Sequence, residues 1–318
     1  MRRYEETRLT DCSGNRLTRI MDAAAATGIL VPAFNVPYLP MVEAVCEALA
    51  RHRTFGMVEV ARLELVKFES RSLAAVAEQY RQYADPRFVT LHLDHVPVID
   101  EDGLTVDWRA LIGEALELGY DSVMIDGSRL PLDTNIAVAA EVARMAHARG
   151  VAVEAELGAV LGHESGPLPP YDELFASKRG FTDPADAARF VRETGVDWLS
   201  VSIGSIHGAI SGAAKDKAKV QARLDIDHLK LLRAATGIPL VLHGGSGVKR
   251  ECVDEAIAHG IAKINIATDI RQPYERALAS GGSVKDAQDA VVAAMTGLIR
   301  LYQIEGSADK LRDLAGEP

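Results

Sequence analysis

Short, almost continuously apolar runs recur along the chain, and segments with a helical spacing of apolar positions separate them. Runs of this kind, without polar–apolar alternation, are typical of strands that are buried on both faces, as in parallel sheets. The eight predicted strands are Gly28–Asn35, Phe55–Ala61, Phe88–Asp94, Ser122–Asp126, Val151–Gly158, Trp198–Gly204, Ile238–Gly244 and Ala262–Ala267.

Each interval between these strands has room for a loop and a helix. Eight strands that alternate with helices predict an α/β protein of the (β/α)8 TIM-barrel class. The alternative is a doubly wound open sheet, which usually carries a Gly-rich turn after its first strand, whereas that place reads AFNVPYLP here. We expect residues 1–15 to be an N-terminal extension and residues 16–318 to form one barrel domain with a C-terminal helical tail.

The segment FTDPADAARFVRETG shows the helical pattern clearly. Asp183 is a predicted N-cap and Pro184 suits the first helical position, while Gly195 can adopt the left-handed conformation that ends a helix. The residues expected to face the barrel are Ala187, Phe190, Val191 and Thr194.

The chain has 318 residues, and its 35 Lys and Arg against 45 Asp and Glu give a net charge of −10. This charge argues against partners such as nucleic acid or an anionic membrane surface, which require basic faces. No apolar run is long enough to span a membrane, and MRRYEETRLTDCSGN lacks the apolar core of a secretory signal. Cys12, Cys46 and Cys252 suit neither a disulfide framework nor a metal-binding pair. We therefore expect a cytoplasmic protein.

Polar residues stand at the ends of most predicted strands. The active site of a parallel barrel lies at the carboxyl ends of its strands, so these residues are the candidates for chemistry. They are Asn35, Asp94, His95, Asp126, Glu154, Glu156, His207, His243, Asn265, Thr268 and Asp269.

Three of these residues, His95, His207 and His243, are histidines at three different strand ends. Catalytic zinc typically takes three protein ligands and keeps a position for water or substrate, which three imidazoles can satisfy. The alternative, three hydrogen-bonded structural histidines, is less favoured because it leaves their coincidence unexplained. Of the others, we expect His92 inside the barrel, His163 in a solvated loop, and the rest at the surface: His52, His147, His228 and His259.

A second cluster lies in the turns after strands seven and eight, the loops that most often form a phosphate site in barrels. HGGSG, which begins at His243, follows strand seven, and Thr268 and Asp269 follow strand eight. Arg271 stands just beyond and could pair with an anionic group. Glycine clusters also serve as tight turns, and Arg271 has the alternative of a surface arginine.

The ordered motifs AFNVP, LHLDH, GYDSVMIDGS, VEAELG, GHES, FTDP, SIGSIHG, LVLHGGSG and KINIATDIR run from about Arg16 to about Leu301. Together they resemble the class II, metal-dependent ketose-phosphate aldolases, which include fructose- and tagatose-bisphosphate aldolases. The resemblance implies a zinc cofactor, a sugar-phosphate substrate and, by family habit, a homodimer or homotetramer. It leaves open the aldehyde, the stereochemistry at the cleaved bond and the use of a monovalent cation.

The resemblance assigns metal ligands and catalytic residues by motif. It implies that His95, His207 and His243 bind the catalytic zinc, and that two carboxylates, Asp126 and Glu156, line an alternative metal position.

The resemblance also implies that Asp94 is the acid/base at the hydroxyl of the cleaved bond. Glu164, in GHES, takes the place of the mobile-loop glutamate that moves a proton at the ketone fragment, and Asn265 that of the residue holding the enediolate. The expected substrate-binding residues, phosphate pockets included, are Asn35, Gly208, Gly244, Ser246, Thr268, Asp269 and Arg271.

The chemistry of aldol cleavage agrees with these residue types. Cleavage leaves a carbanion next to a carbonyl, and zinc can stabilise the developing charge as a Lewis acid. A carboxylate must take the hydroxyl proton as the carbon–carbon bond breaks. None of the strand-end residues is a lysine, so a Schiff-base mechanism is disfavoured.

Two positions depart from the pattern of the family. Where a Gln-x-Ser pattern is frequent after strand two, the chain has Glu59, Val60 and Ala61, followed by Arg62. A negative charge there would oppose a substrate phosphate unless Arg62 offsets it. Ala267 stands where many fructose-bisphosphate enzymes have aspartate and tagatose-type members more often have alanine.

We therefore predict a zinc-dependent aldolase that reversibly cleaves a ketose 1-phosphate or 1,6-bisphosphate to dihydroxyacetone phosphate and an aldehyde. The alternatives within enzymes are an aldolase for a different modified sugar phosphate and a barrel hydrolase that uses zinc-bound hydroxide. Outside enzymes, the alternative is a sugar-phosphate-binding barrel without turnover.

Overall fold

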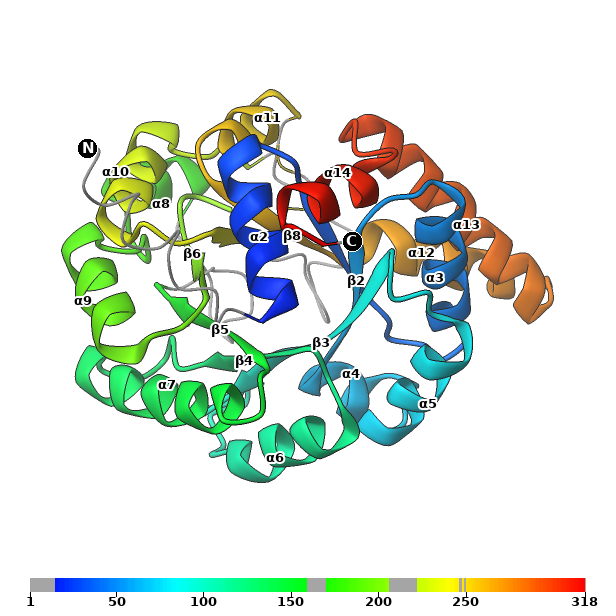
Figure 1. Ribbon diagram of the computed structural model, residues 1–318, viewed down its shortest axis with the longest axis horizontal. Coiled ribbons are helices and arrows are strands. Elements are labelled where there is room, and N and C mark those ends of the chain that lie inside the picture. The colour runs from blue at the N-terminus through cyan, green and yellow to red at the C-terminus, as the bar shows by residue number, and fades with distance from the viewer. Residues whose placement is uncertain (1–14, 159–169, 206–221, 246–247, 249, 318) are drawn as a thin grey trace.

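The computed structural model describes residues 15–158, 170–205, 222–245, 248 and 250–317. In this part of the chain, eight parallel strands pair in chain order and close into a barrel (Figure 1). The predicted (β/α)8 barrel is therefore confirmed. The strands are β1 (Val31–Asn35), β2 (Gly56–Ala61), β3 (Val89–Pro97), β4 (Ser122–Asp126), β5 (Ala152–Leu157), β6 (Trp198–Val201), β7 (Leu240–Leu242) and β8 (Ile261–Ile266).

Helices surround the strands on the outside (Figure 1). The described helices are α2 (Arg16–Thr27), α3 (Met41–Arg51), α4 (Arg62–Lys67), α5 (Leu73–Tyr83), α6 (Trp108–Leu118), α7 (Leu132–His147), α8 (Tyr171–Ser177), α9 (Pro184–Thr194), α10 (Ile226–Thr236), α11 (Arg250–Ala258), α12 (Thr268–Ala279), α13 (Val284–Leu301) and α14 (Ser307–Leu314).

The strand boundaries differ from the predicted ones for identifiable reasons. β1 begins at Val31 because Gly28, at φ 68°, is the left-handed C-cap of α2. β3 continues past Asp94 to Pro97, since an irregularity in its pairing lets the strand resume beyond that point.

The helix α9 has the predicted capping residues. Asp183 accepts hydrogen bonds from the amides of Ala185 and Asp186, Pro184 opens the helix, and Gly195 ends it at φ 70°. On the predicted inner face, three residues are buried and Val191 is half-buried; the buried ones are Ala187, Phe190 and Thr194.

The helix α2 crosses the amino-terminal end of the barrel. The side-chain amide of Asn15 donates to the carbonyl of Gly150, just before β5, and Arg16 Nη2 donates to the carbonyl of Pro86 (2.8 Å), before β3. In Figure 1 this helix lies in front of the strands, so the barrel is seen from its amino-terminal end. The carboxyl ends of the strands face away from the viewer.

The C-terminal helix α14 docks on the same end, beside the residues that lead into β2. The amide of Gly306 donates to the carbonyl of His52 (3.0 Å), and the amide of Ala308 donates to the carbonyl of Arg53 (3.1 Å). Arg53 also forms an ion pair with Asp309 at 2.7 Å. The segment that contains α14 therefore covers part of the amino-terminal end of the barrel.

The docking of this C-terminal segment buries His52, which the sequence placed at the surface. Its Nδ1 lies 2.9 Å from a carboxylate oxygen of Glu305, and its Nε2 lies 3.0 Å from the hydroxyl of Thr296. That prediction is wrong, because α3 ends under the C-terminal helices and is covered by them.

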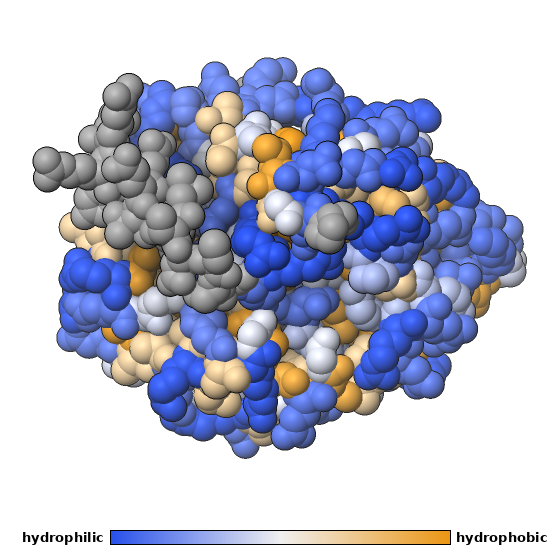
Figure 2. Space-filling model, in the orientation of Figure 1, coloured by the Kyte–Doolittle hydropathy of each residue, from blue (hydrophilic) through white to orange (hydrophobic). Residues whose placement is uncertain are grey.

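The face in Figure 2 is mainly hydrophilic, with small and scattered apolar areas. None of the helices among the described residues has the length and apolar character required to cross a lipid bilayer.

The N-cap of α9 gives a test of local stability. Replacement of Asp183 by Ala removes the acceptor of two helix amides and should lower the free energy of unfolding by about 1 kcal/mol. Urea titration of both proteins measures the change.

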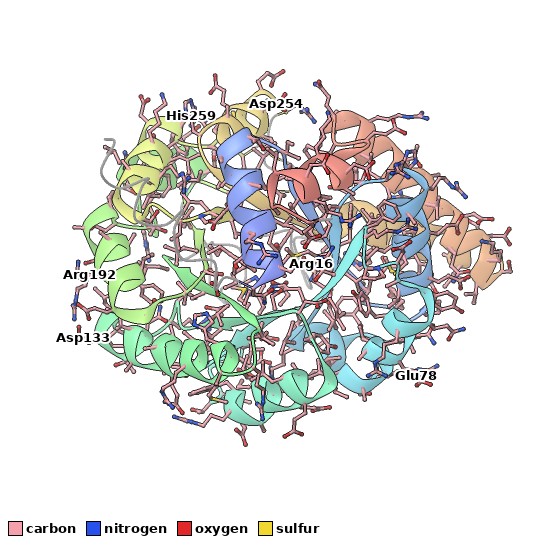
Figure 3. All side chains as sticks on the ribbon, viewed as in Figure 1. Arg16, Glu78, Asp133, Arg192, Asp254 and His259 are labelled. Carbon is pink, nitrogen blue, oxygen red and sulfur yellow. The ribbon has the colours of Figure 1, made fainter. Side chains whose placement is uncertain are left out.

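The matched control is Glu78→Ala, an exposed position on α5 whose side chain points outward (Figure 3). It should change stability by less than about 0.5 kcal/mol. Equal effects of the two substitutions would contradict the capping role.

Candidate active site

A β-bulge in β3 brings two consecutive side chains to one site. Leu93 pairs with Val123 of β4, but Val96 pairs with Ile125, so β3 has one extra residue between these positions. Consecutive residues of a regular strand point to opposite faces, and a bulge re-aims one of them. His95 lies in the bulge with φ 36°, in the left-handed region that non-glycine residues rarely adopt.

The bulge places Asp94 and His95 in a cluster with His243, which follows β7. One ligand atom of each residue lies within 4.8 Å of the others. The two imidazole rings are close, with centroids 4.5 Å apart. Side chains from opposite sides of the barrel thus converge at its carboxyl end.

A second cluster shares His95 with the first. Its Nδ1 lies 3.4 Å from Asp126 Oδ2 and 3.8 Å from Glu156 Oε2, and these ligand atoms also lie within 4.8 Å of one another. The two carboxylates predicted for an alternative metal position are therefore next to the main cluster. The side chains of His95 and Asp126 keep 24% and 19% exposure, so this part of the site is open to solutes.

The donor set suits a transition metal that accepts nitrogen and oxygen ligands, such as zinc. Glu156 Oε2 is buried and lies 3.3 Å from His243 Nδ1 without an aligned hydrogen bond among the described residues, as expected for an atom that a cation would satisfy. Burial lowers the pKa of both histidines, but Asp94, among other groups, raises that of His95 to about 9. Glu154 and Glu156 raise that of His243 to about 10. The site thus favours positive charge.

Asp94 is held between two amides. Asn35 donates to its Oδ2 (3.1 Å) and Asn265 donates to its Oδ1 (2.9 Å). Burial opposes ionisation of Asp94, but the positive charges of His95 and Lys263 outweigh it and lower the pKa to about 2. The structure therefore places an ionised carboxylate beside the metal-ligand cluster, where it can accept a proton.

The sequence analysis missed Glu64, the third residue of α4. Its Oε2 accepts the amide hydrogen of Ala61 (2.8 Å), and the side chain is buried near Asn35. Burial raises the pKa of Glu64 to about 8, opposed by the hydrogen bond from Ala61 and supported by the charge of Asp94. Its position in a short helix with no distinctive motif gave no signal.

The sequence suggested that the negative charge of Glu59 would oppose a substrate phosphate, but the side chain lies inside the barrel and not at its open carboxyl end. It points into the barrel, is 0% exposed, and its Oε2 lies 3.2 Å from the Lys263 ammonium. Arg62 does not offset its charge either, since its guanidinium is 3.3 Å from Asp100. The buried Lys263 was also missed, because it lies near the start of β8 and only strand ends were considered.

On the phosphate side, the turn after β7 contains Gly244 at φ 67°, a conformation that favours glycine. Thr268 and Asp269 lie in the first turn of α12. Arg271 Nη1 donates to both carboxylate oxygens of Glu275 (2.7 and 2.8 Å), so its charge is already paired.

Several predicted residues lie outside the described part of the chain: His207, Gly208, Glu164, Ser246 and the loop residue His163. His92 is confirmed as a barrel residue. It is 0% exposed, and its Nδ1 lies 2.8 Å from the Ser122 hydroxyl.

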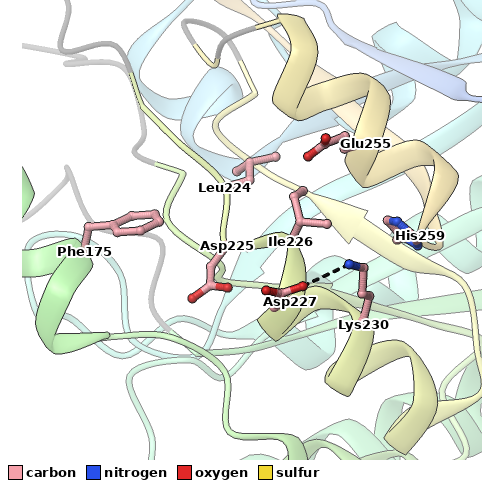
Figure 4. Close-up of a pocket in the computed structure, with 8 residues that line it drawn as sticks. All are labelled: Phe175, Leu224, Asp225, Ile226, Asp227, Lys230, Glu255 and His259. Atoms are coloured by element: carbon pink, nitrogen blue, oxygen red, sulfur yellow. Dashed lines mark hydrogen bonds and ion pairs between the residues drawn. The ribbon is translucent and has the colours of Figure 1, made fainter.

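A separate cavity of about 460 Å³ lies outside the barrel beside α8, α10 and α11 (Figure 4). Its one cation, Lys230, is paired with Asp227 at 2.9 Å. None of the predicted site residues lines it; the lining residues are Phe175, Leu224, Asp225, Ile226, Asp227, Lys230, Glu255 and His259.

The barrel and a histidine–carboxylate cluster at its carboxyl end define an enzyme of the metal-dependent barrel class. The family model described as class-II fructose-bisphosphate aldolase matches residues 15–307, and the chain belongs to this family, whose members are aldehyde-lyases. The resemblance found in the sequence is therefore confirmed.

Individual relatives agree. The chain is 33% identical to a fructose-bisphosphate aldolase of Streptococcus pneumoniae over 265 residues, 81% of this chain and 80% of the relative. It is 40% identical to a fructose-bisphosphate aldolase of Streptococcus pyogenes over 190 residues, which are 59% and 56% of the two chains. The crystal structure of the YdjI aldolase from Escherichia coli K12 superposes with a TM-score of 0.70 at 25% identity, covering 92% of this chain and 98% of that one.

The pKa values of the two histidines predict that metal binding releases protons. At pH 7.5, below pKa values of about 9 and 10, both imidazoles are protonated in the metal-free protein, and a metal must displace those protons. The apparent zinc affinity should therefore rise with pH from 6.5 to 8.5, by about tenfold per pH unit for each proton displaced.

Competition with a chromophoric chelator at each pH measures this slope. The variant His243→Ala should lose about one proton from it. An affinity that does not change with pH in the wild-type protein would contradict the assignment of these ligands.

Proposed function

We propose that the protein is a zinc-dependent aldolase that reversibly cleaves a ketose 1-phosphate or 1,6-bisphosphate to dihydroxyacetone phosphate and an aldehyde. The observation that carries this proposal is the Asp94 carboxylate, fixed by two amides and adjacent to the His95 and His243 ligand cluster. A proton acceptor and an electrophile side by side are what aldol cleavage requires.

His95, His207 and His243 would hold the zinc, with Asp126 and Glu156 next to an alternative position. When bound, zinc supplies Lewis-acid polarisation of the substrate carbonyl.

Asp94 removes the proton from the hydroxyl at the bond to be cleaved. The carbon–carbon bond then breaks, the aldehyde leaves, and the bonding electron pair remains on the ketone fragment as an enediolate. Asn265 would hold the enediolate; its amide lies beside the proton acceptor, since it donates to Asp94. Glu164 returns a proton to the carbon of the ketone fragment.

The substrate phosphate would bind at the turns after β7 and β8. We assign this role to Gly208, Gly244, Ser246 and Thr268, whose backbone amides and hydroxyls suit phosphate oxygens. Asn35 and Asp269 contribute at the substrate, and Arg271 would bind a distal phosphate only by exchanging its contact with Glu275 for one with the ligand.

The proposal also covers the domain organisation, the location and the oligomeric state of the enzyme. Residues 16–318 form one barrel domain after an extension of residues 1–15. The enzyme acts in the cytoplasm as a homodimer or homotetramer, without nucleic-acid or membrane partners.

The test is a panel of ketose phosphates that includes fructose 1,6-bisphosphate and tagatose 1,6-bisphosphate. Release of dihydroxyacetone phosphate is followed before and after treatment with a chelator. We expect cleavage of at least one member, its loss in the metal-stripped enzyme, and its recovery when zinc is added.

Undiminished cleavage by the stripped enzyme would remove the zinc assignment. Hydrolysis of esters that lack phosphate would favour the barrel hydrolase. Binding of dihydroxyacetone phosphate without proton exchange from its carbon would favour a binding protein without turnover.

Replacement of Asp94 by Ala should lower kcat for cleavage by about 10²- to 10⁴-fold, the usual contribution of an acid/base group. Zinc should remain bound, because the histidines are unchanged. Metal content measured on the purified variant is the control, and a metal-replete variant with the wild-type kcat would rule out the role of Asp94.

A further inference from the structure

Four ionisable side chains lie inside the barrel, beneath the metal-ligand cluster. Glu59, His92, Glu154 and Lys263 are each 0% exposed. Barrel interiors are usually filled by branched apolar residues, and buried charges cost stability unless they are paired. Their presence at this depth therefore needs a reason.

Three oxygen atoms surround the Lys263 ammonium. Asn265 Oδ1 lies at 2.7 Å, Glu154 Oε2 at 3.0 Å and Glu59 Oε2 at 3.2 Å. The contact with Glu59 lacks the alignment of a hydrogen bond. Burial raises the pKa of Glu59 well above its ordinary value, with Asp94 adding to the rise and Lys263 opposing it. Burial lowers the pKa of Lys263, but Glu154, Glu59 and Asp94 raise it above the ordinary value of 10.5, so the amine is a cation and not a nucleophile.

One branch of contacts leads from this ammonium to the metal ligands. Glu154 Oε2 faces Lys263 and accepts a hydrogen bond from Trp198 Nε1 (2.7 Å). Its other oxygen, Oε1, lies 2.9 Å from His243 Nε2. Because an ionised carboxylate can only accept, Nε2 keeps its proton whether the imidazole is charged or neutral. Nδ1 of His243 then faces the ligand cluster, 3.3 Å from Glu156 Oε2.

The other branch leads to the proton acceptor. An ammonium can only donate, so the atom of Asn265 that faces Lys263 must be its oxygen. The amide nitrogen of Asn265 then points to Asp94 Oδ1 (2.9 Å). The lysine thus decides which way this amide is turned.

We propose that Lys263 is a positioning residue that orients both halves of the site. Through Glu154 it directs His243 to the metal, and through Asn265 it directs the amide that holds Asp94. Glu59 is the third group in contact with the ammonium and keeps it between the two branches. The proposal rests on the proposed aldolase function for its kinetic consequences, but not for its effect on metal binding.

The test is the double variant Lys263→Met/Glu59→Gln, which removes the buried ammonium together with a carboxyl group that faces it. Metal affinity should fall about 10- to 100-fold, as for other residues that orient a metal-ligating histidine. At saturating metal, kcat for ketose-phosphate cleavage should fall about 100-fold, with KM changed less than threefold.

The control is Lys285→Met/Asp289→Asn, an exposed ion pair on α13 at 2.9 Å, which removes the same charges at the surface. It should retain the wild-type metal affinity and kcat. A folded double variant with wild-type metal affinity and kcat would overturn the proposal.

Addition of Asp94→Ala separates a positioning role from a general loss of stability. If Lys263 acts through Asp94, this substitution should lower kcat much less in the double variant than in the wild-type protein. Effects that simply multiply would overturn the branch through Asn265.

A measurement on the wild-type protein tests the branch through Glu154 and His243 even if the double variant does not fold. In the long-range ¹H–¹⁵N spectrum of the zinc-loaded protein, His243 should carry its proton on Nε2, with assignment by loss of the signal in His243→Gln. A proton on Nδ1 would overturn the proposal. If the wild-type protein cleaves none of the sugar phosphates, the proposed function fails, while this spectrum and the metal affinity still test the positioning role.

Discussion

The ammonium group of Lys263 lies inside the barrel with no access to water, and carboxyl groups of Glu59 on β2 and Glu154 on β5 lie 3.2 and 3.0 Å from it. Loss of one partner from a buried pair typically costs about 3–5 kcal/mol, because the other charge is left without compensation. The side chains on the inner faces of β2, β5 and β8 therefore depend on one another. This explains why the polar residues of β3, β5 and β8 extend below the strand ends and into the interior.

The second constraint is local strain at the carboxyl end of β3. The bulge holds His95 in a backbone conformation that costs free energy, and it also allows Asp94 and His95 to act at the same site. A regular strand would direct one of these side chains away from the barrel axis. The rigid interior below and the pairing of β3 on both sides hold this unfavourable conformation in place.

The barrel could be predicted from the sequence, because buried parallel strands leave a continuous apolar pattern. The residues at the strand ends could be predicted because the barrel topology brings those ends together. His95, His243, Asp126 and Glu156 could be found in this way. The orientation of Glu59 and the role of Lys263 could not, since both depend on contacts across the barrel between strands far apart in the chain. The burial of His52 was missed for the same reason: the helices that cover it come about 250 residues later.

The docking of α14 has a consequence for the order of events during synthesis. All eight strands precede the segment whose amides bond to His52 and Arg53. While the chain emerges from the ribosome, the amino-terminal end of the barrel therefore stays without this cover until residues 306–314 have been synthesised. A nascent chain at this stage exposes apolar surface of α2 and α3, and we expect it to be a substrate for chaperones that recognise such surface.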